Sequence, residues 1–462
     1  MDNKLILFIR NFSYTLSSNI ISLSVNGLIL LIIPKIVGIA EYGYIQYYTL
    51  LGTYIVFLHC GWNDGIYLRY GGQKYDELDS HTFSQQFWGI VIFSLVQVTL
   101  YLILLNNINI DNNKYFVFLY AIFAMLIILP RIFISTVLQV SNRMKEFSIS
   151  LITERIFYVI LLTIMLIYGI RDFKVLLIGD LIGKLFSLVY GAKCCSNIVF
   201  HNPKFNKKSF VEIKENIGVG IFLLLSNLCS ILITGIVQFF IENKWNIETF
   251  SKVALTFNIS RMLMLIINSV SIVIFPLLKN TKNEELPALY EKIRKLTMII
   301  LLAILIFYYP MRVMLSIWLP QYADSFKFVA LLLPICIFES KSSMLVSTYL
   351  KVLRKETVLF SVNFIMVLIS FLFSFITVYL LSSLELAILS ITVVLGIKSI
   401  LLEFFVSKII EVQIMNDTII EILMVLIFIS CSWFIDSWFS FLIYLVVYCI
   451  YLLANLIKPI KY

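Results

Sequence analysis

Basic side chains stand inside long apolar stretches of this sequence, where a charge is costly. Arg131, Arg261 and Lys341 lie well inside such stretches and have no acidic neighbour on the same helical face, whereas Arg155 lies nearer a helix end. A charge at membrane depth costs a few kcal/mol or more unless it faces a partner or water. Arg also offers phosphate two parallel hydrogen bonds and stays charged at physiological pH. These four residues are candidates for an anion site that could hold a pyrophosphate group.

Acidic residues at similar depth offer the alternative that the charges are neutralised in pairs. Glu154, Glu339 and Glu403 lie on other helices, from which they could pair with the basic residues. Asp180 and Lys184, at i and i+4 with the acid first, form a favourable pair on their own helix, which we interpret as structural. Spacing alone leaves both the anion site and the paired charges open.

Polar side chains recur at the same helical spacing in two apolar stretches. The spacing i, i+3 and i+7 appears near the start of the chain and again about 208 residues later. The residues are Asn19, Ser22, Asn26, Asn227, Ser230 and Thr234, and Asn258 shares a face with Arg261. Such side chains commonly hydrogen-bond between packed membrane helices, and they could equally line two walls of a hydrated cleft.

The elements that must position these residues are membrane helices. Of the 462 residues, 60% are hydrophobic and 14% charged, and the mean hydropathy is +0.95. A soluble domain carries about 25% charged residues, so the composition excludes a soluble enzyme. Apolar runs of bilayer length occur about fourteen times. We expect an all-α polytopic membrane protein with helices at 12–34, 44–62, 84–106, 115–138, 147–169, 174–194, 217–241, 251–278, 296–317, 326–348, 357–381, 385–407, 415–435 and 438–457.

The formal net charge of +9 is explained by membrane topology. With the N-terminus in the cytoplasm, about 22 basic residues fall in cytoplasmic loops and about 7 in outer loops, as the positive-inside rule predicts. Lys292, Arg294 and Lys295 are placed in one such cytoplasmic loop. Both termini are therefore expected in the cytoplasm, and no nucleic-acid partner is needed to explain the charge.

An internal repeat predicts two parallel six-helix lobes. Segment 135–146 resembles 347–356, at an offset of about 210 residues, and Pro130, which is expected to interrupt the fourth helix, has a counterpart in Pro334 of the tenth. Six helices return the chain to the same side of the membrane, so both copies begin in the cytoplasm. We expect an N-lobe at 1–200, a cytoplasmic linker at 201–216, a C-lobe at 217–410 and a C-terminal helix pair at 411–462.

Catalytic and cofactor motifs are missing from the sequence. It has no phosphate-binding Gly-rich loop, no metal-ligand cluster and no Ser/His/Asp arrangement, and its seven Cys are scattered. The connectors are too short to hold a soluble catalytic domain. We therefore expect no enzyme activity, no metal and no cofactor.

Four segments resemble those of the multidrug, oligosaccharidyl-lipid and polysaccharide exporter superfamily, in particular its Wzx-like polysaccharide flippases. They are 38–43 with Glu41, 61–70 with Gly65 and Arg69, 143–146 with Arg143, and 273–278. The resemblance covers nearly the whole chain, as a pattern of helix lengths and loops. It implies two six-helix lobes around a cationic cavity, with the first and seventh helices beside a lipid portal.

The resemblance further implies a flippase that moves undecaprenyl-pyrophosphate-linked oligosaccharide repeat units to the outer leaflet by alternating access. Its setting would be a bacterial inner membrane, with membrane lipid and the polymerase and chain-length proteins of the same pathway as partners. The product would be an O-antigen, capsule or exopolysaccharide. Na+ or H+ coupling is left open, with Glu339 and Asp180 as candidate sites.

Two other functions are open besides the flippase. A multidrug antiporter of the same superfamily would favour an acidic site for cationic drugs, against which the basic excess argues. A membrane glycan polymerase would need catalytic residues and a large outer loop, which the sequence lacks. Both remain as alternatives.

Overall fold

The protein is helical throughout the part of the chain that its structure describes. The computed structural model describes residues 3–203, 205–279, 283–353 and 355–457. Each of the fourteen predicted ranges falls on one helix or on a run of short helices within these residues. The all-α prediction is thereby confirmed.

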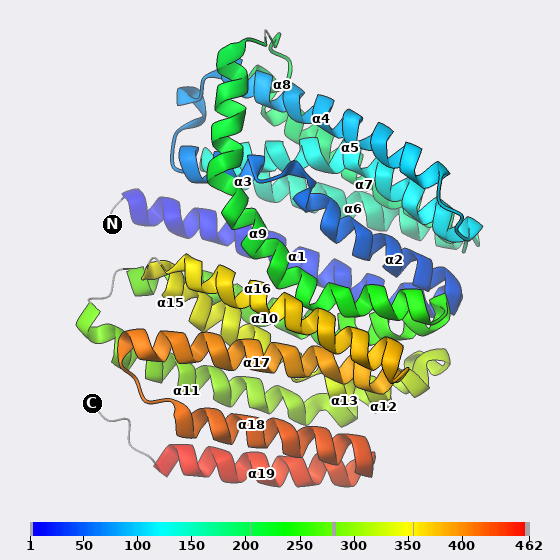
Figure 1. Cartoon of the computed structure of the whole chain (residues 1–462), viewed down its shortest axis with the longest axis vertical. Helices are drawn as coiled ribbons and strands as arrows, with labels where there is room; N and C mark the ends of the chain where they lie inside the picture. Colours follow the sequence, from blue (N-terminus) through cyan, green and yellow to red (C-terminus); the bar gives the residue numbers. More distant parts are fainter. Residues whose placement is uncertain (1–2, 204, 280–282, 354, 458–462) are drawn as a thin grey trace. The chain divides into compact units, whose positions relative to one another are not determined.

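The chain divides into two units, Met1–Leu228 (unit 1) and Cys229–Tyr462 (unit 2). In unit 1, α4, α5, α6 and α7 run alongside one another (Figure 1). The helices of unit 1 are α1 (Asn3–Ile36), α2 (Ile39–Ile55), η1 (Val56–His59), α3 (Trp62–Tyr70), η2 (Tyr75–Glu77), α4 (Ser80–Asn106), α5 (Asn112–Val140), α6 (Met144–Ile167), α7 (Phe173–Cys194), α8 (Ser196–Val199) and the first part of α9 (Lys207–Lys244).

Unit 2 contains the rest of α9 and a second set of long helices, several of them broken into shorter runs. They are α10 (Ile247–Lys279), η3 (Asn283–Glu285), α11 (Leu286–Ile304), η4 (Leu305–Phe307), α12 (Tyr308–Trp318), η5 (Pro320–Phe328), α13 (Val329–Leu332), α14 (Ile335–Ser340), η6 (Lys341–Val346), α15 (Ser347–Val352), α16 (Glu356–Phe375), η7 (Ile376–Leu380), α17 (Leu384–Ile410), α18 (Met415–Ser430), η8 (Cys431–Ile435) and α19 (Trp438–Ile457).

Proline breaks one helix run and leaves another continuous. Pro334 lies at the junction of two segments, Pro320–Leu332 and Ile335–Leu350, which are bent by 44°. A proline inside a helix removes a hydrogen bond and crowds the preceding turn, so a bend there is expected. Pro130 lies inside α5, which continues through it. The predicted interruption of the fourth helix is therefore wrong.

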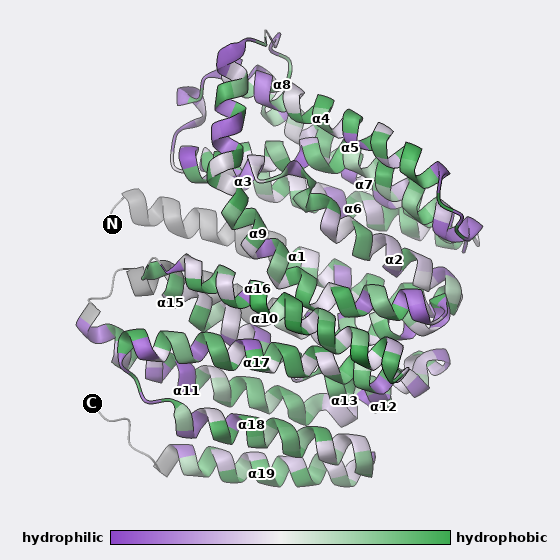
Figure 2. Cartoon of the chain, in the orientation of Figure 1, coloured by the Kyte–Doolittle hydropathy of each residue, from purple (hydrophilic) through white to green (hydrophobic). Residues whose placement is uncertain are grey.

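The helices have the length and composition of membrane spans. Ten pass as candidate spans, and an eleventh is the pair bent at Pro334, within the described residues. Hydrophobic residues cover most of the long helices such as α4, α17 and α19, and hydrophilic residues gather at helix ends, in loops and along the first part of α9 (Figure 2). Large apolar side chains such as Ile103 and Leu453 are more than half exposed, as expected for surfaces that face lipid. The chain is thus a multi-pass membrane protein, and fourteen crossings with cytoplasmic termini remain a prediction.

Close packing of α3 on α9 explains why the division between the units falls inside α9. A Cβ atom at Gly65 would lie 1.8 Å from the carbonyl oxygen of Asn216, and one at Gly220 would lie 2.0 Å from the carbonyl oxygen of Gly61. Glycine at these positions lets the two backbones touch. The predicted linker, 201–216, includes the first turns of α9.

An ion-pair clamp adds to this contact between α3 and α9. Arg69 donates to the Glu212 carboxylate at 2.7 Å, to Glu215 at 2.8 Å and to the Asn216 side chain at 2.6 Å. Tyr70 donates its hydroxyl hydrogen to Glu212. Burial and this hydrogen bond raise the pKa of Tyr70 above its ordinary value, so the hydroxyl stays a donor.

Candidate functional site

Four charged side chains meet between three helices of unit 1. Arg131 of α5 forms an ion pair with Glu154 of α6, and Lys184 of α7 forms one with Asp180. Lys184 Nζ also lies 4.0 Å from the Glu154 carboxylate. The hydroxyl of Tyr48, on α2, donates to Asp180 at 2.9 Å. We call Arg131, Glu154, Asp180 and Lys184 the unit 1 charge cluster.

The unit 1 charge cluster is partly exposed, and a further basic residue, Arg155, lies near it. Its four side chains are between 7% and 15% exposed. The Arg131 Nε atom is buried and has no hydrogen-bond partner among the described residues. Arg155 follows Glu154 on α6 and is close enough to Asp180 to interact with its charge, without an ion pair within 4.0 Å to any described residue. With Arg155 included, three basic groups face two carboxylates, so the net charge is +1.

Small residues allow α6 and α7 to approach closely at this cluster. A Cβ atom at Gly183 would lie 2.9 Å from the carbonyl oxygen of Glu154. Ser150 and Ser187 hydrogen-bond side chain to side chain at 2.9 Å across the same interface. Small residues are favoured where membrane helices pack closely, because they bring backbones together. The small side chains of Gly183, Ser150 and Ser187 therefore let α6 and α7 approach closely enough for their charged side chains to meet.

A second group of charges is sealed inside unit 2. Lys341 of η6 donates to Glu403 of α17 at 2.7 Å and to Glu421 of α18 at 2.9 Å. Arg294 of α11 lies 2.5 Å from Glu403 and 3.3 Å from Glu421. The four side chains are at most 5% exposed. We call Lys341, Arg294, Glu403 and Glu421 the sealed tetrad; its two basic and two acidic groups balance.

Arg294 is the member of the sealed tetrad that the sequence analysis missed. The predicted loop position of Arg294 is wrong, because α11 begins at Leu286 and Arg294 is 4% exposed within it. The signal that could have found it is Pro287 in the first turn of α11, because proline is favoured there. The first ten residues of α11 include several charged ones, so they do not form an apolar run, and hydropathy alone does not mark this helix start.

A third group of contacts joins two predicted residues, Glu339 and Ser230, with Lys398, which is buried and was not proposed for a site. Lys398 of α17 donates to Glu339 of α14 at 3.1 Å and to Ser230 of α9 at 3.1 Å. Glu339, a candidate for coupling to an ion, thus has a basic partner. The alternative of neutralised charges is found at Arg131, Lys341 and Lys398, each of which has an acidic partner on another helix.

The other predicted residues are spread over both units. The Arg261 guanidinium is exposed on α10 and lies 5.5 Å from the ring centroid of Phe257. Asn258 and Asn26 are half-buried, and Asn227 is exposed. The side chain of Asn19 lies outside the described residues, as do those of 273–278. Arg131 and Arg155 belong to unit 1, whereas Arg261 and Lys341 belong to unit 2.

Solved transporter structures share this fold. An inward-facing multidrug resistance MATE family transporter of the MOP superfamily matches with a TM-score of 0.68 and 13% identity, over 84% of this chain and 94% of that one. The lipid II flippase MurJ, in an inward closed conformation, matches with a TM-score of 0.66 and 16% identity, over 97% of this chain and 100% of that one. These proteins are a transporter and a flippase rather than enzymes, and at these identities they show the fold alone.

Family membership comes from the sequence. No curated protein matches the chain. The family described as "Polysaccharide biosynthesis protein" matches residues 8–282, which is more than half of the chain. With the shared fold, this match confirms the resemblance to the exporter superfamily. The chain therefore belongs to the polysaccharide biosynthesis protein family.

Proposed function

We propose that this protein is a flippase for undecaprenyl-pyrophosphate-linked oligosaccharide repeat units. It would move them from the cytoplasmic to the outer leaflet of a bacterial inner membrane by alternating access, for the synthesis of a surface polysaccharide. The family match and the fold shared with a lipid II flippase support a lipid-linked substrate. The pathway's polymerase and chain-length proteins would be its partners.

The observation that carries this proposal is the positive excess of the unit 1 charge cluster taken together with Arg155. A pyrophosphate group brings negative charge and several acceptor oxygens, and a guanidinium can give it two parallel hydrogen bonds. Arg155 interacts with the Asp180 charge but makes no ion pair within 4.0 Å among the described residues, and Arg131 has a buried Nε atom without an acceptor there. Both groups would gain by binding phosphate oxygens. We assign them as the head-group ligands of the proposed site.

The sealed tetrad is less suited to a ligand. Lys341 is fully buried and already donates to two carboxylates, so a pyrophosphate would have to displace Glu403 and Glu421. That exchange would leave two carboxylates without partners in a low-dielectric interior, at a cost of several kcal/mol. We therefore assign Lys341 a structural role in unit 2, and keep the exposed Arg261 as a further candidate ligand.

Reconstitution tests the proposed function. Vesicles holding the purified protein and a labelled polyprenyl-pyrophosphate sugar should exchange the lipid between leaflets faster than protein-free vesicles. Arg155→Gln should lower the initial rate about tenfold at low substrate concentration, which corresponds to one charge-assisted contact. Arg171→Gln is the matched control, because Arg171 is exposed in the loop between α6 and α7. Its rate should equal that of the wild type.

The competing function is a small-molecule antiporter, which the likeness to the MATE family transporter supports at the level of fold. The positive excess of the unit 1 charge cluster together with Arg155 would repel cationic drugs. Transport of a cationic dye, with no acceleration of lipid exchange, would overturn the flippase proposal. Lipid exchange without dye transport would exclude the antiporter.

A further inference from the structure

The two ends of α7 are held by charged residues from neighbouring segments. At its start, the Phe173 N–H donates to the Glu41 carboxylate of α2 at 2.8 Å. The Tyr44 ring, one turn further along α2, stacks on the Phe173 ring with centroids 4.7 Å apart. Phe173 is 1% exposed, so this attachment is buried. Glu41 belongs to segment 38–43, one of the four that resemble the exporter superfamily.

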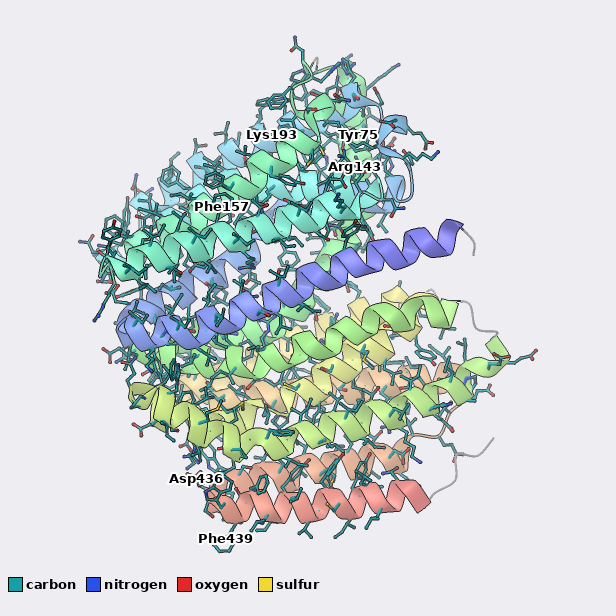
Figure 3. The ribbon with its side chains drawn as sticks, turned by 180° about the vertical axis from the view of Figure 1, so that it is seen from behind. Tyr75, Arg143, Phe157, Lys193, Asp436 and Phe439 are labelled. Carbon is teal, nitrogen blue, oxygen red and sulfur yellow. The ribbon has the colours of Figure 1, made fainter. Side chains whose placement is uncertain are left out.

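Arg143 holds the other end of α7. Its Nη1 atom donates at 2.9 Å to the carbonyl of Cys194, the last residue of the helix. Glu146 accepts from two other guanidinium nitrogens of Arg143, at 3.2 and 3.0 Å. The guanidinium lies 4.6 Å from the ring centroid of Tyr75, and Figure 3 shows these two residues together at one end of unit 1. The Arg143 side chain is thereby fixed in direction.

The signs of these two charges match the helix they hold. A helix carries partial positive charge at its start and partial negative charge at its end. Glu41 faces the free N–H groups at the start, and Arg143 faces a free carbonyl at the end. Each contact also satisfies a backbone group that the helix itself leaves without a partner.

α7 carries Asp180 and Lys184, which make up half of the unit 1 charge cluster. A slip of one residue would move both side chains by about 1.5 Å along the axis and turn them by about 100°. The Asp180 contact to Tyr48, at 2.9 Å, and the Lys184 contact to Glu154, at 4.0 Å, would not survive that change. The arrangement of the cluster therefore depends on where α7 begins and ends.

We propose that Glu41 and Arg143 are positioning residues of the anion site, acting through α7. Neither belongs to the unit 1 charge cluster; each fixes the axial position and rotation of the helix that carries Lys184 and Asp180. This inference rests on the proposed function for its effect on transport, but its effect on helix position is independent of any substrate.

A disulfide between α6 and α7 measures helix position directly. A Cβ atom at Gly179 would lie 3.8 Å from the Leu161 Cβ atom. That separation is close to the mean Cβ–Cβ distance of disulfides, about 3.8 Å. A Leu161→Cys/Gly179→Cys protein should therefore cross-link quickly with a membrane-permeant oxidant. Mass spectrometry of the joined peptides distinguishes this bond from any involving the seven native cysteines.

Adding Glu41→Ala or Arg143→Ala to that pair should slow cross-linking about tenfold, as expected when α7 loses one end contact. Asp79→Ala is the matched control: Asp79 accepts from the His81 and Thr82 N–H groups at the start of α4, which carries none of the cluster. It should leave the cross-linking rate unchanged. In Glu41→Gln, which keeps an acceptor oxygen, most of the rate should return. An unchanged rate in both Glu41→Ala and Arg143→Ala would overturn the proposal.

Transport supplies the second readout. In the native-cysteine background, Glu41→Ala should raise the substrate concentration for half-maximal lipid exchange more than it lowers the maximal rate, and Asp79→Ala should not. If Glu41→Ala and Arg143→Ala slow cross-linking as expected but the wild-type protein moves no lipid, the proposed function would be rejected and the positioning role kept. Unchanged half-maximal concentration together with slowed cross-linking would reject the link between α7 and the anion site.

Discussion

At the scale of single residues, the sequence cues become clear only through their partners. Gly65 and Arg69 stood out in the sequence as part of a turn, and the structure shows that both face α9. Glu41 and Arg143 likewise proved to hold the ends of α7. None of these pairings joins residues close in sequence, so spacing could mark the residues as unusual without naming what they touch.

Gly65 provides the sharpest test at this scale. In Gly65→Ala the new methyl group would lie 1.8 Å from the carbonyl oxygen of Asn216, and backbone cannot move aside as a side chain can. We expect a loss of about 3 kcal/mol in the free energy of unfolding, at the upper end of the usual cost of overpacking. Gly218→Ala is the control, since a Cβ atom there meets nothing within 4 Å. Thermal unfolding of both proteins in detergent checks this; equal melting temperatures would contradict the close contact.

At the scale of elements, helix positions were predicted well and helix starts less well. The range 296–317 correctly marked the apolar part of a helix, but α11 begins at Leu286, so Arg294 lies inside the protein rather than in a loop. Apolar runs mark the part of a helix that faces lipid. A charged turn buried against other helices escapes that search, because its partners, Glu403 and Glu421, are distant in sequence.

The sealed tetrad connects α11, η6, α17 and α18, and its balance of charge gives a prediction about these elements. Glu403→Gln should cost about 3–5 kcal/mol in the free energy of unfolding, because it leaves two buried basic groups, Lys341 and Arg294, with Glu421 as their one buried carboxylate within the tetrad. Lys341→Met combined with Glu403→Gln should be less damaging than Glu403→Gln alone, since Arg294 and Glu421 stay paired at 3.3 Å. Thermal unfolding of the single and double variants measures the coupling. Additive losses would show that the charges act separately.

At the scale of the whole molecule, the sequence predicted the class of protein and the kind of surface it presents. Mean hydropathy and apolar runs identified a helical membrane protein, because lipid imposes the same demand on every span. The sequence could not show which basic residues keep a carboxylate partner. Arg131 and Arg155 both lie within predicted membrane spans, 115–138 and 147–169, yet only Arg131 is paired with Glu154. Pairing between helices depends on rotation about each axis, which hydropathy does not record.

The number of membrane crossings is inferred from the length and composition of the helices. It can be tested by finding on which side of the membrane each chain end lies. Ten candidate spans pass by length and composition within the described residues, and the pair bent at Pro334 makes eleven. The apolar helix Ile20–Ile36 is shorter, α2 has 17 residues, and α10 lies partly outside the described side chains. If these three cross as well, the count is fourteen, which is even, and both termini lie on one side.

A reporter that is active only in the cytoplasm, fused in turn to the N-terminus and the C-terminus, decides between these counts. Fourteen crossings and the excess of basic residues in the expected cytoplasmic loops predict activity at both ends. Eleven crossings would place the ends on opposite sides, so that one fusion would be inactive. A fusion after Lys244, at the end of α9, is the internal control: with seven crossings before it, this site should face outward and give no activity. Activity there would show that one of the seven expected crossings up to Lys244 does not span the membrane. It would contradict the topology expected for this part of the chain.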